Sequence, residues 1–508
     1  MDSKNKRIVT NSILLNLRMI LVLLVTLYTS RVVLEVLGVV DFGIYNVVAG
    51  LVALMTFVGN SLSNSSQRYL NIGLANDNLE ETRQYFQQSF TINVIIILII
   101  IAIAETAGLW FVRNRLVLPA DRLYAAIWAY QMALAIVIYT FLQVPFNSAV
   151  VAREKFSFFA YIGILDVFLK LVCAFLIKFF VDGNNLVRYS VLLMLCSLIT
   201  LLTYVVYCMR KFPECRPAFI WRHGLVKEMG IFIGHNFFGS FAWSAGNQGT
   251  NVLLNLFFGP TVNAARGIAM QVYSAVYRFT DTISTAIKPQ IIQSYAHGNI
   301  AYMMSLVSKG SVFSFIFMLF LIVPIVFNID FVLRLWLGTN VAYSSAFTSL
   351  LLVDALVNTL PATLLLAAMA TGNIKRNQVW GRCFILMVLP ISYIALKLFP
   401  IPILPFIIGI VLSLFYTAYC IYDIKIQTGM AYGTYFRKVL LPISYVLFPL
   451  CAVSWIEVIF IENEIFRFLC ISATDIVITG SLTYLFVFDK DERAVVRKFI
   501  HSRLLHKG

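Results

Sequence analysis

Long apolar runs recur from one end of the chain to the other, and they constrain its fold more than any other feature. Loops that carry charge, glycine or proline divide the 508 residues into about fourteen runs, each long enough to cross a bilayer as a helix. Hydrophobic residues make up 60% of the sequence, and the mean hydropathy is +0.85. A soluble core does not absorb this much apolar surface, and a β-barrel would show alternating segments of about ten residues. The sequence therefore predicts an all-α, multi-pass membrane protein.

Lysine and arginine are distributed unevenly between the loops that separate these runs. If the N-terminus is cytoplasmic, the inner segments hold about 25 of them and the outer segments about 7. This asymmetry predicts an even number of spans and two cytoplasmic termini, and it accounts for the net charge of +15 without a nucleic-acid partner. The expected spans are 10–36, 42–66, 87–112, 122–148, 158–180, 187–208, 230–257, 262–286, 303–328, 344–371, 380–398, 402–422, 438–460 and 466–487.

The sequence carries no motif for a cofactor, a metal or a soluble catalytic domain. Its eight cysteines show no CxxC spacing, so we expect neither a disulfide framework nor a zinc site. A GxxxxGK(S/T) motif is missing, which argues against ATP hydrolysis. The basic stretch 210–228 and the charged tail are too short to fold as soluble domains. We therefore expect no enzymatic activity and no cofactor, apart from a coupling proton or sodium ion. The N-terminal basic residues precede an apolar run without a cleavage site, which predicts an uncleaved first span.

Two consecutive spans between Gly234 and Gln293 carry polar residues at helical spacing. The first span presents one polar sector, and the second repeats it with charge. The stripes comprise Asn236, Ser240, Trp243, Asn247 and Asn251, then Asn263 and Arg266 near the turn, and then Gln271, Ser274, Arg278, Asp281 and Thr285. Ionisable side chains at membrane depth are costly and usually face a hydrated cavity. Alternatively, amides and hydroxyls hold helices together. The two arginines favour a substrate-carrying chamber.

Other charged residues inside spans are candidates of different kinds. Arg18 has no acidic neighbour on its helix face, which favours a position in a cavity. Arg31 lies four residues before Glu35, a spacing that favours a local ion pair. The same spacing pairs Lys170 with Asp166 and favours a structural role there. Candidates for proton or cation coupling are Glu105, Asp281 and Asp354, the last with Asn358 nearby. Asp475 is a weaker candidate because it lies in the last span.

A sequence repeat divides the chain. LGVVDFGIYN and SLSNSSQRYLN correspond in order to LFFGPTVNAARG and STAIKPQIIQS at an offset of roughly 221 to 223 residues, as in transporters built from parallel repeats. We therefore predict two six-helix lobes related by a pseudo-twofold axis, followed by two additional helices. The predicted divisions are 1–208 for the first lobe, 209–229 for a cytoplasmic basic connector, 230–424 for the second lobe, 425–487 for the additional helices and 488–508 for a cytoplasmic charged tail.

Four of these segments resemble a known family. NSILLNLRM, LGVVDFGIYNVVAG, FFGPTVNAARGIAMQV and KPQIIQSYAHGN are similar to segments of bacterial polysaccharide exporters of the Wzx type. These exporters belong to the multidrug/oligosaccharidyl-lipid/polysaccharide (MOP) flippase superfamily. The resemblance covers essentially the whole chain, and FGPTVNAARGIA is its most specific part. It implies a V-shaped cavity between two lobes. It also implies alternating-access flipping, across the inner membrane, of an undecaprenyl-pyrophosphate-linked oligosaccharide of the O-antigen (lipopolysaccharide) or capsule type. The implied partners are this lipid, the bilayer and other polysaccharide-assembly proteins.

The resemblance also implies roles for cationic residues of the cavity, which family members are thought to use for phosphates and sugars. We carry that role to Arg18, Arg266 and Arg278 first, and to Arg31 and Lys170 second. Arginine suits a pyrophosphate because its planar fork donates two parallel hydrogen bonds. The candidate sugar contacts are Trp243, Asn236, Asn247, Asn251, Asn263 and Gln271. Tyr273 and Tyr277 are aromatic candidates too, although packing is the favoured role for them.

Other functions remain open at this stage. A cation-coupled multidrug exporter of the same superfamily is the main alternative, but drug cations favour an acidic cavity and the core charges here lean basic. A membrane glycosyltransferase or glycan polymerase would need a large outer loop with convergent acids or arginines, whereas the longest outer loops have about fifteen residues. A scaffold without transport would not need charged, hydrated stripes.

Overall fold

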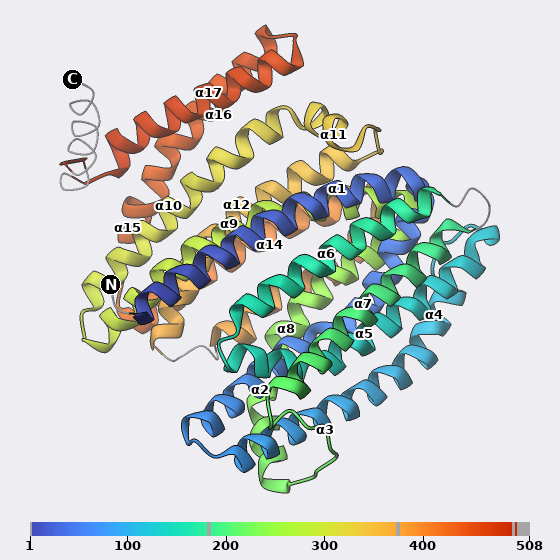
Figure 1. Ribbon diagram of the computed structural model, residues 1–508. Coiled ribbons are helices and arrows are strands. Elements are labelled where there is room, and N and C mark those ends of the chain that lie inside the picture. The colour runs from blue at the N-terminus through green and yellow to red at the C-terminus, as the bar shows by residue number, and fades with distance from the viewer. Residues whose placement is uncertain (1–2, 180–183, 372–375, 490–492, 495–508) are drawn as a thin grey trace, which may run out of the picture. The chain divides into compact units, whose positions relative to one another are not determined.

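A computed structural model describes residues 3–179, 184–371, 376–489 and 493–494, and every regular element in these ranges is a helix (Figure 1). The side chains of residues 3–20, and of a small number of positions elsewhere, chiefly in the eighth and ninth helices, lie outside this description. The all-α fold expected from the apolar runs is confirmed.

The described residues in the first half of the chain form seven α-helices. They are α1 (Ser3–Ala53), α2 (Phe57–Ala75), α3 (Leu79–Ile103), α4 (Leu109–Asn114), α5 (Leu123–Ala152), α6 (Phe156–Lys178) and α7 (Asn185–Lys211). A π-helical turn, Ala104–Gly108, joins α3 to α4, and its Ala104 carbonyl accepts a 2.8 Å hydrogen bond from the Tyr130 hydroxyl of α5. Gly38, with φ 73° and ψ 170°, breaks α1 and so separates the first two predicted spans.

The second half begins with two long helices joined by a single glycine. They are α8 (His223–Phe258) and α9 (Pro260–Ala296), with Gly259 between them. The remaining helices are α10 (Ile300–Phe327), α11 (Ile329–Leu337), α12 (Ser344–Thr371), α13 (Arg382–Leu398), α14 (Leu404–Thr428), α15 (Tyr432–Tyr435), α16 (Leu441–Phe460) and α17 (Glu464–Leu482).

Eleven stretches of the described chain are long and apolar enough to cross a membrane. The first, Leu21–Leu74, contains the break at Gly38 and therefore corresponds to two predicted spans. The helices α8 and α9 are 36 and 37 residues long, carry the polar stripes and are not among the eleven. Together these helices account for the spans expected from the sequence.

The chain divides into two compact units. Unit 1 comprises Met1–Gly267 and Leu386–Pro405, and unit 2 comprises Ile268–Ile385 and Phe406–Gly508. The helices α9 and α13 each begin in one unit and end in the other, and the boundary after Pro405 lies in the first turn of α14. The lobes proposed from the sequence repeat stay a prediction.

Each unit has its own apolar core. In unit 1, α1 packs against α5 and α6, and α5 packs against α7. Small residues of α5, such as Ala125 and Ala129, are fully buried there, which allows helices to approach closely. In unit 2, α10 packs against α12, α16 and α17, and its core includes Met303, Leu319 and Ile471.

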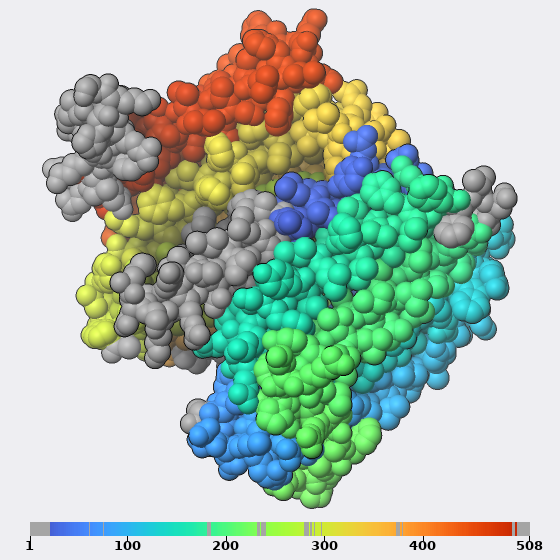
Figure 2. Space-filling model, viewed as in Figure 1, coloured from blue at the N-terminus to red at the C-terminus, as the bar shows by residue number. Residues whose placement is uncertain are grey.

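The connector between α7 and α8 is folded against unit 1 (Figures 1 and 2, green). Its backbone amides at Ile220 and Arg222 donate to Thr91 and Gln88 of α3, at 3.1 and 3.0 Å. Glu214 is 1% exposed and pairs with Arg153 at 2.8 Å. A hydrogen bond with Cys208 and burial raise the pKa of the Cys215 thiol, so this thiol stays protonated at neutral pH. The basic connector is therefore anchored along its length.

A buried pair of thiols offers a test of the packing between α6 and α7. The Sγ atoms of Cys173 and Cys196 lie 3.1 Å apart, so a small movement brings them to disulfide distance. We expect mild oxidation of isolated membranes to link these two cysteines in most of the protein. Peptide mass spectrometry without reduction would detect the link, and Cys196→Ser should abolish it. If only other cysteine pairs form, the packing of α6 on α7 described here is wrong.

Candidate functional site

The polar stripes meet in a cluster of amides in unit 1, where α8 turns into α9. We call Asn46, Asn247, Asn251, Asn255, Asn263 and Arg266 the amide cluster. The Asn263 side-chain nitrogen of α9 donates to the backbone oxygen and the Oδ1 of Asn251, at 2.7 and 2.8 Å. The Asn251 side-chain nitrogen in turn donates to the Asn46 backbone oxygen of α1, at 3.0 Å. One chain of hydrogen bonds thus joins α9 to α8 and α8 to α1.

Arg266 belongs to the same cluster, one turn further along α9. It is 6% exposed, and its Nη2 donates to the backbone oxygen and the Oδ1 of Asn247, at 2.6 and 3.0 Å. The buried Nε has no acceptor among the atoms that the structure describes. A buried guanidinium needs acceptors to offset its lost hydration. Asn247 supplies two acceptors, both to Nη2, and the buried Nε–H donor remains unused.

Asn255 ties α8 to the loop that follows α4. Its Oδ1 accepts from the Val117 amide at 2.9 Å, and its Nδ2 donates to the Val117 carbonyl oxygen at 3.4 Å. Asn255 is fully buried, so both backbone groups of one loop residue are satisfied by a single side chain. The loop and the last turns of α8 therefore form one hydrogen-bonded end.

Glycines allow α1 to approach this end closely. A Cβ on Gly43 would lie 1.8 Å from the backbone oxygen of Pro260, the first residue of α9. A Cβ on Gly50 would lie 2.8 Å from Nδ2 of Asn251. The backbone of α1 thus packs directly on the α8–α9 turn, as small residues permit between membrane helices.

Four of the predicted site residues, Asn247, Asn251, Asn263 and Arg266, are brought together in the cluster. Their side chains bond in pairs, Asn263 to Asn251 and Arg266 to Asn247. Such bonding agrees with the alternative interpretation of the stripes, in which amides hold helices together. Sequence reasoning missed Asn255, although it continues the stripe four residues after Asn251. It also missed Asn46, for which the apolar second span gave no periodic signal.

The other predicted binding residues are dispersed over both units. Trp243 of α8 is 57% exposed, and Arg31 and Arg278 are exposed. The Asp166–Lys170 pair is present at 2.6 Å, as the spacing predicts. Glu35, which the spacing places beside Arg31, forms an ion pair with Lys178 of α6 at 3.0 Å. The side chains of Arg18, Asn236 and Asp281 lie outside the described residues.

Three other candidate side chains of the second span belong to unit 2. Gln271 is half-buried, and its Oε1 has no partner in the described part of the chain. Tyr273 and Tyr277 stack with centroids 5.5 Å apart and pack against the core of unit 2. The packing role favoured for the two tyrosines is confirmed.

The predicted coupling acids occupy different surroundings. Asp354 of α12 accepts a 2.7 Å hydrogen bond from the Ser413 hydroxyl of α14, and Asn358 donates to that hydroxyl oxygen at 3.3 Å. Glu105 lies in the π-helical turn, is exposed, and accepts from Gln131 at 3.2 Å. Asp475 is 0% exposed and accepts from Thr479 at 2.7 Å. Among the described residues, no cluster of three potential metal ligands occurs.

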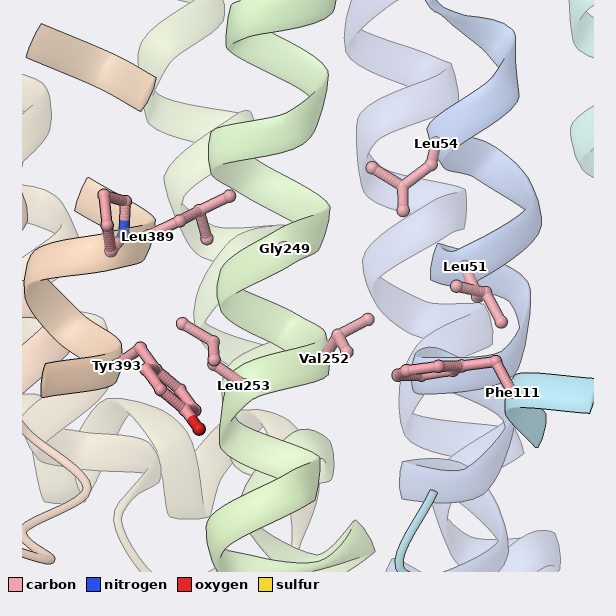
Figure 3. A pocket seen from close by; sticks show the side chains of 9 residues that line it. Leu51, Leu54, Phe111, Gly249, Val252, Leu253, Leu389 and Tyr393 are labelled. Carbon is pink, nitrogen blue, oxygen red and sulfur yellow. The ribbon is translucent and has the colours of Figure 1, made fainter. Parts of the chain in front are cut away.

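An apolar pocket of about 480 Å³ opens on another face of α8, within unit 1 (Figure 3). Residues of α8 form its floor, α13 lines one side, and α1, its short 3₁₀ extension and α4 line the other. The lining residues are Leu51, Leu54, Phe111, Gly249, Val252, Leu253, Leu389, Pro390 and Tyr393.

Comparisons with solved structures relate this fold to known transporters. The structure "Lipid II flippase MurJ, inward closed conformation" matches with a TM-score of 0.71, at 14% identity, over 94% of this chain and 98% of that one. An inward-facing MATE-family multidrug resistance transporter of the MOP superfamily matches with a TM-score of 0.64, at 14% identity, over 80% and 96%. An outward-facing one matches with a TM-score of 0.57, at 13% identity, over 83% and 96%. The chain shares its fold with these solved structures. No protein-family model and no curated protein matches the sequence.

Within this fold, the candidate site combines two kinds of surface on one helix. The amide cluster occupies one face of α8, and the apolar pocket occupies another. This arrangement suits an amphiphilic ligand better than a purely polar or a purely apolar one.

Proposed function

We propose that the chain is a flippase that moves an undecaprenyl-pyrophosphate-linked oligosaccharide from the cytoplasmic to the outer leaflet of the bacterial inner membrane. The observation that carries the proposal is the extent of the structural match. The lipid II flippase corresponds to 94% of this chain, whereas the two MATE transporters correspond to 80% and 83%. Both termini would be cytoplasmic, as the loop charges favour.

The amide cluster supports an alternating-access cycle. Polar contacts between membrane helices contribute about 1 kcal/mol each, so several together stabilise a closed end that can still open. The amides and the guanidinium that bond to one another in the closed end are the groups that suit a pyrophosphate and sugar hydroxyls. In this proposal the headgroup replaces the contacts of Asn251, Asn263 and Arg266 as that end opens.

Further cations complete the proposed headgroup site. Arg18 and Arg278 are assigned to the phosphates, with Arg31 and Lys170 in secondary positions. Trp243 is exposed and available to pack against a sugar ring. The energy would come from proton or sodium movement through Asp281, Asp354 or Glu105. Among these, Asp354 has a hydroxyl and an amide arranged around it.

Neutralising the phosphate-binding arginines tests the proposal. We expect Arg18→Gln with Arg278→Gln to reduce surface glycan at least tenfold in an exporter-deficient strain that makes the matching lipid-linked oligosaccharide. Arg266 is left intact because its burial gives it a structural role as well. Glycan blotting of whole cells measures export, and blotting of membranes confirms the protein level.

A matched control uses an arginine of the same chain that has a structural partner. Arg334 pairs with Glu464 in an exposed position, so Arg334→Gln should leave glycan within twofold of wild type. Unchanged glycan in the double variant, at normal protein level, would contradict the proposed headgroup site.

A second candidate is a cation-coupled multidrug exporter, which the similarity to MATE transporters supports. Drug susceptibility of a pump-deficient strain that expresses the chain separates the two functions. Resistance to several cationic drugs, without any effect on surface glycan, would favour the exporter.

A further inference from the structure

The apolar pocket on α8 has no part in the headgroup chemistry, yet its position is well defined. Gly249, Val252 and Leu253 follow one another at helical spacing and form the floor (Figure 3). Leu389 and Tyr393, one turn apart on α13, point toward the floor from one side. Leu51, Leu54 and Phe111 lie on the other side. A Cβ on Gly249 would lie 2.6 Å from the Leu389 methyl groups, so the missing side chain lets Leu389 of α13 pack directly on the backbone of α8.

The chemistry of the lining restricts the ligand. Among the described residues, no charged side chain lines the pocket, and the Tyr393 hydroxyl is the single polar side-chain group there. Its volume of about 480 Å³ lies within the usual range for ligand sites. A polar ligand would lose its hydrogen bonds to water there without replacement, which is unfavourable. The lining therefore fits a hydrocarbon chain.

The surroundings connect the pocket with the bilayer. Tyr393 itself is partly exposed, and Ile391 and Ile394 beside it on α13 are exposed apolar side chains. In a membrane protein such side chains face lipid. The pocket therefore continues into a surface from which a lipid chain can enter without crossing water.

We propose that this pocket binds the hydrocarbon tail of the lipid-linked substrate, an inference that rests on the proposed function. Two observations favour the substrate's own tail over an ordinary lipid chain. The pocket residues of α8 interleave with Asn247 and Asn251 of the amide cluster, so head and tail engage the same helix. In addition, α13 passes from unit 2 to unit 1 between Ile385 and Leu386, just before the pocket residue Leu389. A tail in the pocket thus contacts a helix that both units share.

Photolabelling of the purified full-length chain tests the assignment. The probe is a polyprenyl diphosphate with a diazirine in its chain, added to protein in lipid nanodiscs. We expect labelled peptides to contain 249–253 or 389–393. Val252→Trp fills the pocket and should reduce this labelling at least tenfold. The control Leu98→Trp adds the same bulk to α3 at a position that is 61% exposed, and it should leave the labelling unchanged.

Competition identifies the occupant. Excess unlabelled polyprenyl diphosphate should remove the label, and the same excess of phosphatidylglycerol should not. Equal competition by the phospholipid would overturn the assignment to the substrate's tail. Labelling spread over the lipid-facing helices and insensitive to Val252→Trp would also overturn it. If Val252→Trp does not fold, Gly249→Ala, which displaces Leu389 within the pocket, takes its place.

The glycan assay separates failure of this inference from failure of the proposed function. If the chain exports glycan but the pocket peptides carry no label, the tail site is wrong and the flippase function stands. If the chain neither exports glycan nor binds the probe, the proposed function fails and the tail site with it.

Discussion

A disulfide between cysteines placed at Gly50 and Asn251 is expected to stop glycan export completely, and reduction is expected to restore it. A Cβ at position 50 lies 2.8 Å from the Asn251 side-chain nitrogen, which the shorter cysteine at 251 removes, and 2.6 Å from the Gln248 Oε1, the flexible end of a side chain that must shift for the link. The proposed cycle requires α1 and α8 to separate at the amide cluster. A covalent link at this point therefore blocks the cycle. The substitution of Asn251 alone has a smaller effect, because it removes only polar contacts between helices that are worth about 1 kcal/mol each.

Mass spectrometry of the unreduced protein would measure the link, because the chain has eight cysteines of its own. The wild-type chain under the same oxidant controls for the native Cys173–Cys196 pair, and the two single variants control for the substitutions. Export at the wild-type rate by fully linked protein would show that the cluster stays closed throughout the cycle.

Gly43→Ala is expected to lower the amount of folded protein in the membrane several-fold. The added Cβ would lie 1.8 Å from the Pro260 oxygen and 2.6 Å from its carbonyl carbon, so one backbone must move away from another. Overpacking of this kind costs about 1–3 kcal/mol or more, a large part of the stability of a typical protein. Thermal unfolding of the detergent-solubilised protein would show a lower Tm than wild type.

Gly230→Ala, in the third turn of helix α8, is the matched control, because no atom of the described side chains lies within 4 Å of the added Cβ. This change should leave the Tm unchanged or raise it slightly, since alanine favours a helix more than glycine. Equal Tm values for the two alanine variants would contradict the close approach of α1 to the α8–α9 turn.

Much of the fold follows from the sequence because membrane spans are encoded by local composition. The apolar runs predict the helices, and the spacing of Asp166 and Lys170 predicts their ion pair. Even the break at Gly38 falls in a predicted loop. Such features depend on residues that are close in the chain, so a single sequence suffices.

The partners of the polar stripe depend on tertiary packing, which periodicity does not determine. Spacing places Asn247 and Asn251 on one face of a helix, but it does not show whether that face meets water or another helix. The structure shows that Asn251 bonds to the backbone of Asn46, 205 residues away in the chain. The apolar pocket was not predicted for the same reason. Its residues come from four separate segments, and each looks like an ordinary span.

The anchored connector has a mechanical consequence. Because unit 1 runs to Gly267, the connector lies within unit 1, where Glu214, Ile220 and Arg222 hold it, and it is not a link between the two units. The chain passes between the units after Gly267, Ile385 and Pro405. All three crossings lie inside helices, the third within the first turn of α14, and α13 has Pro390 a short distance beyond its crossing. Any rocking of the units must therefore bend or twist continuous helices, which would act as elastic hinges that store strain in one half of the stroke and return it in the other.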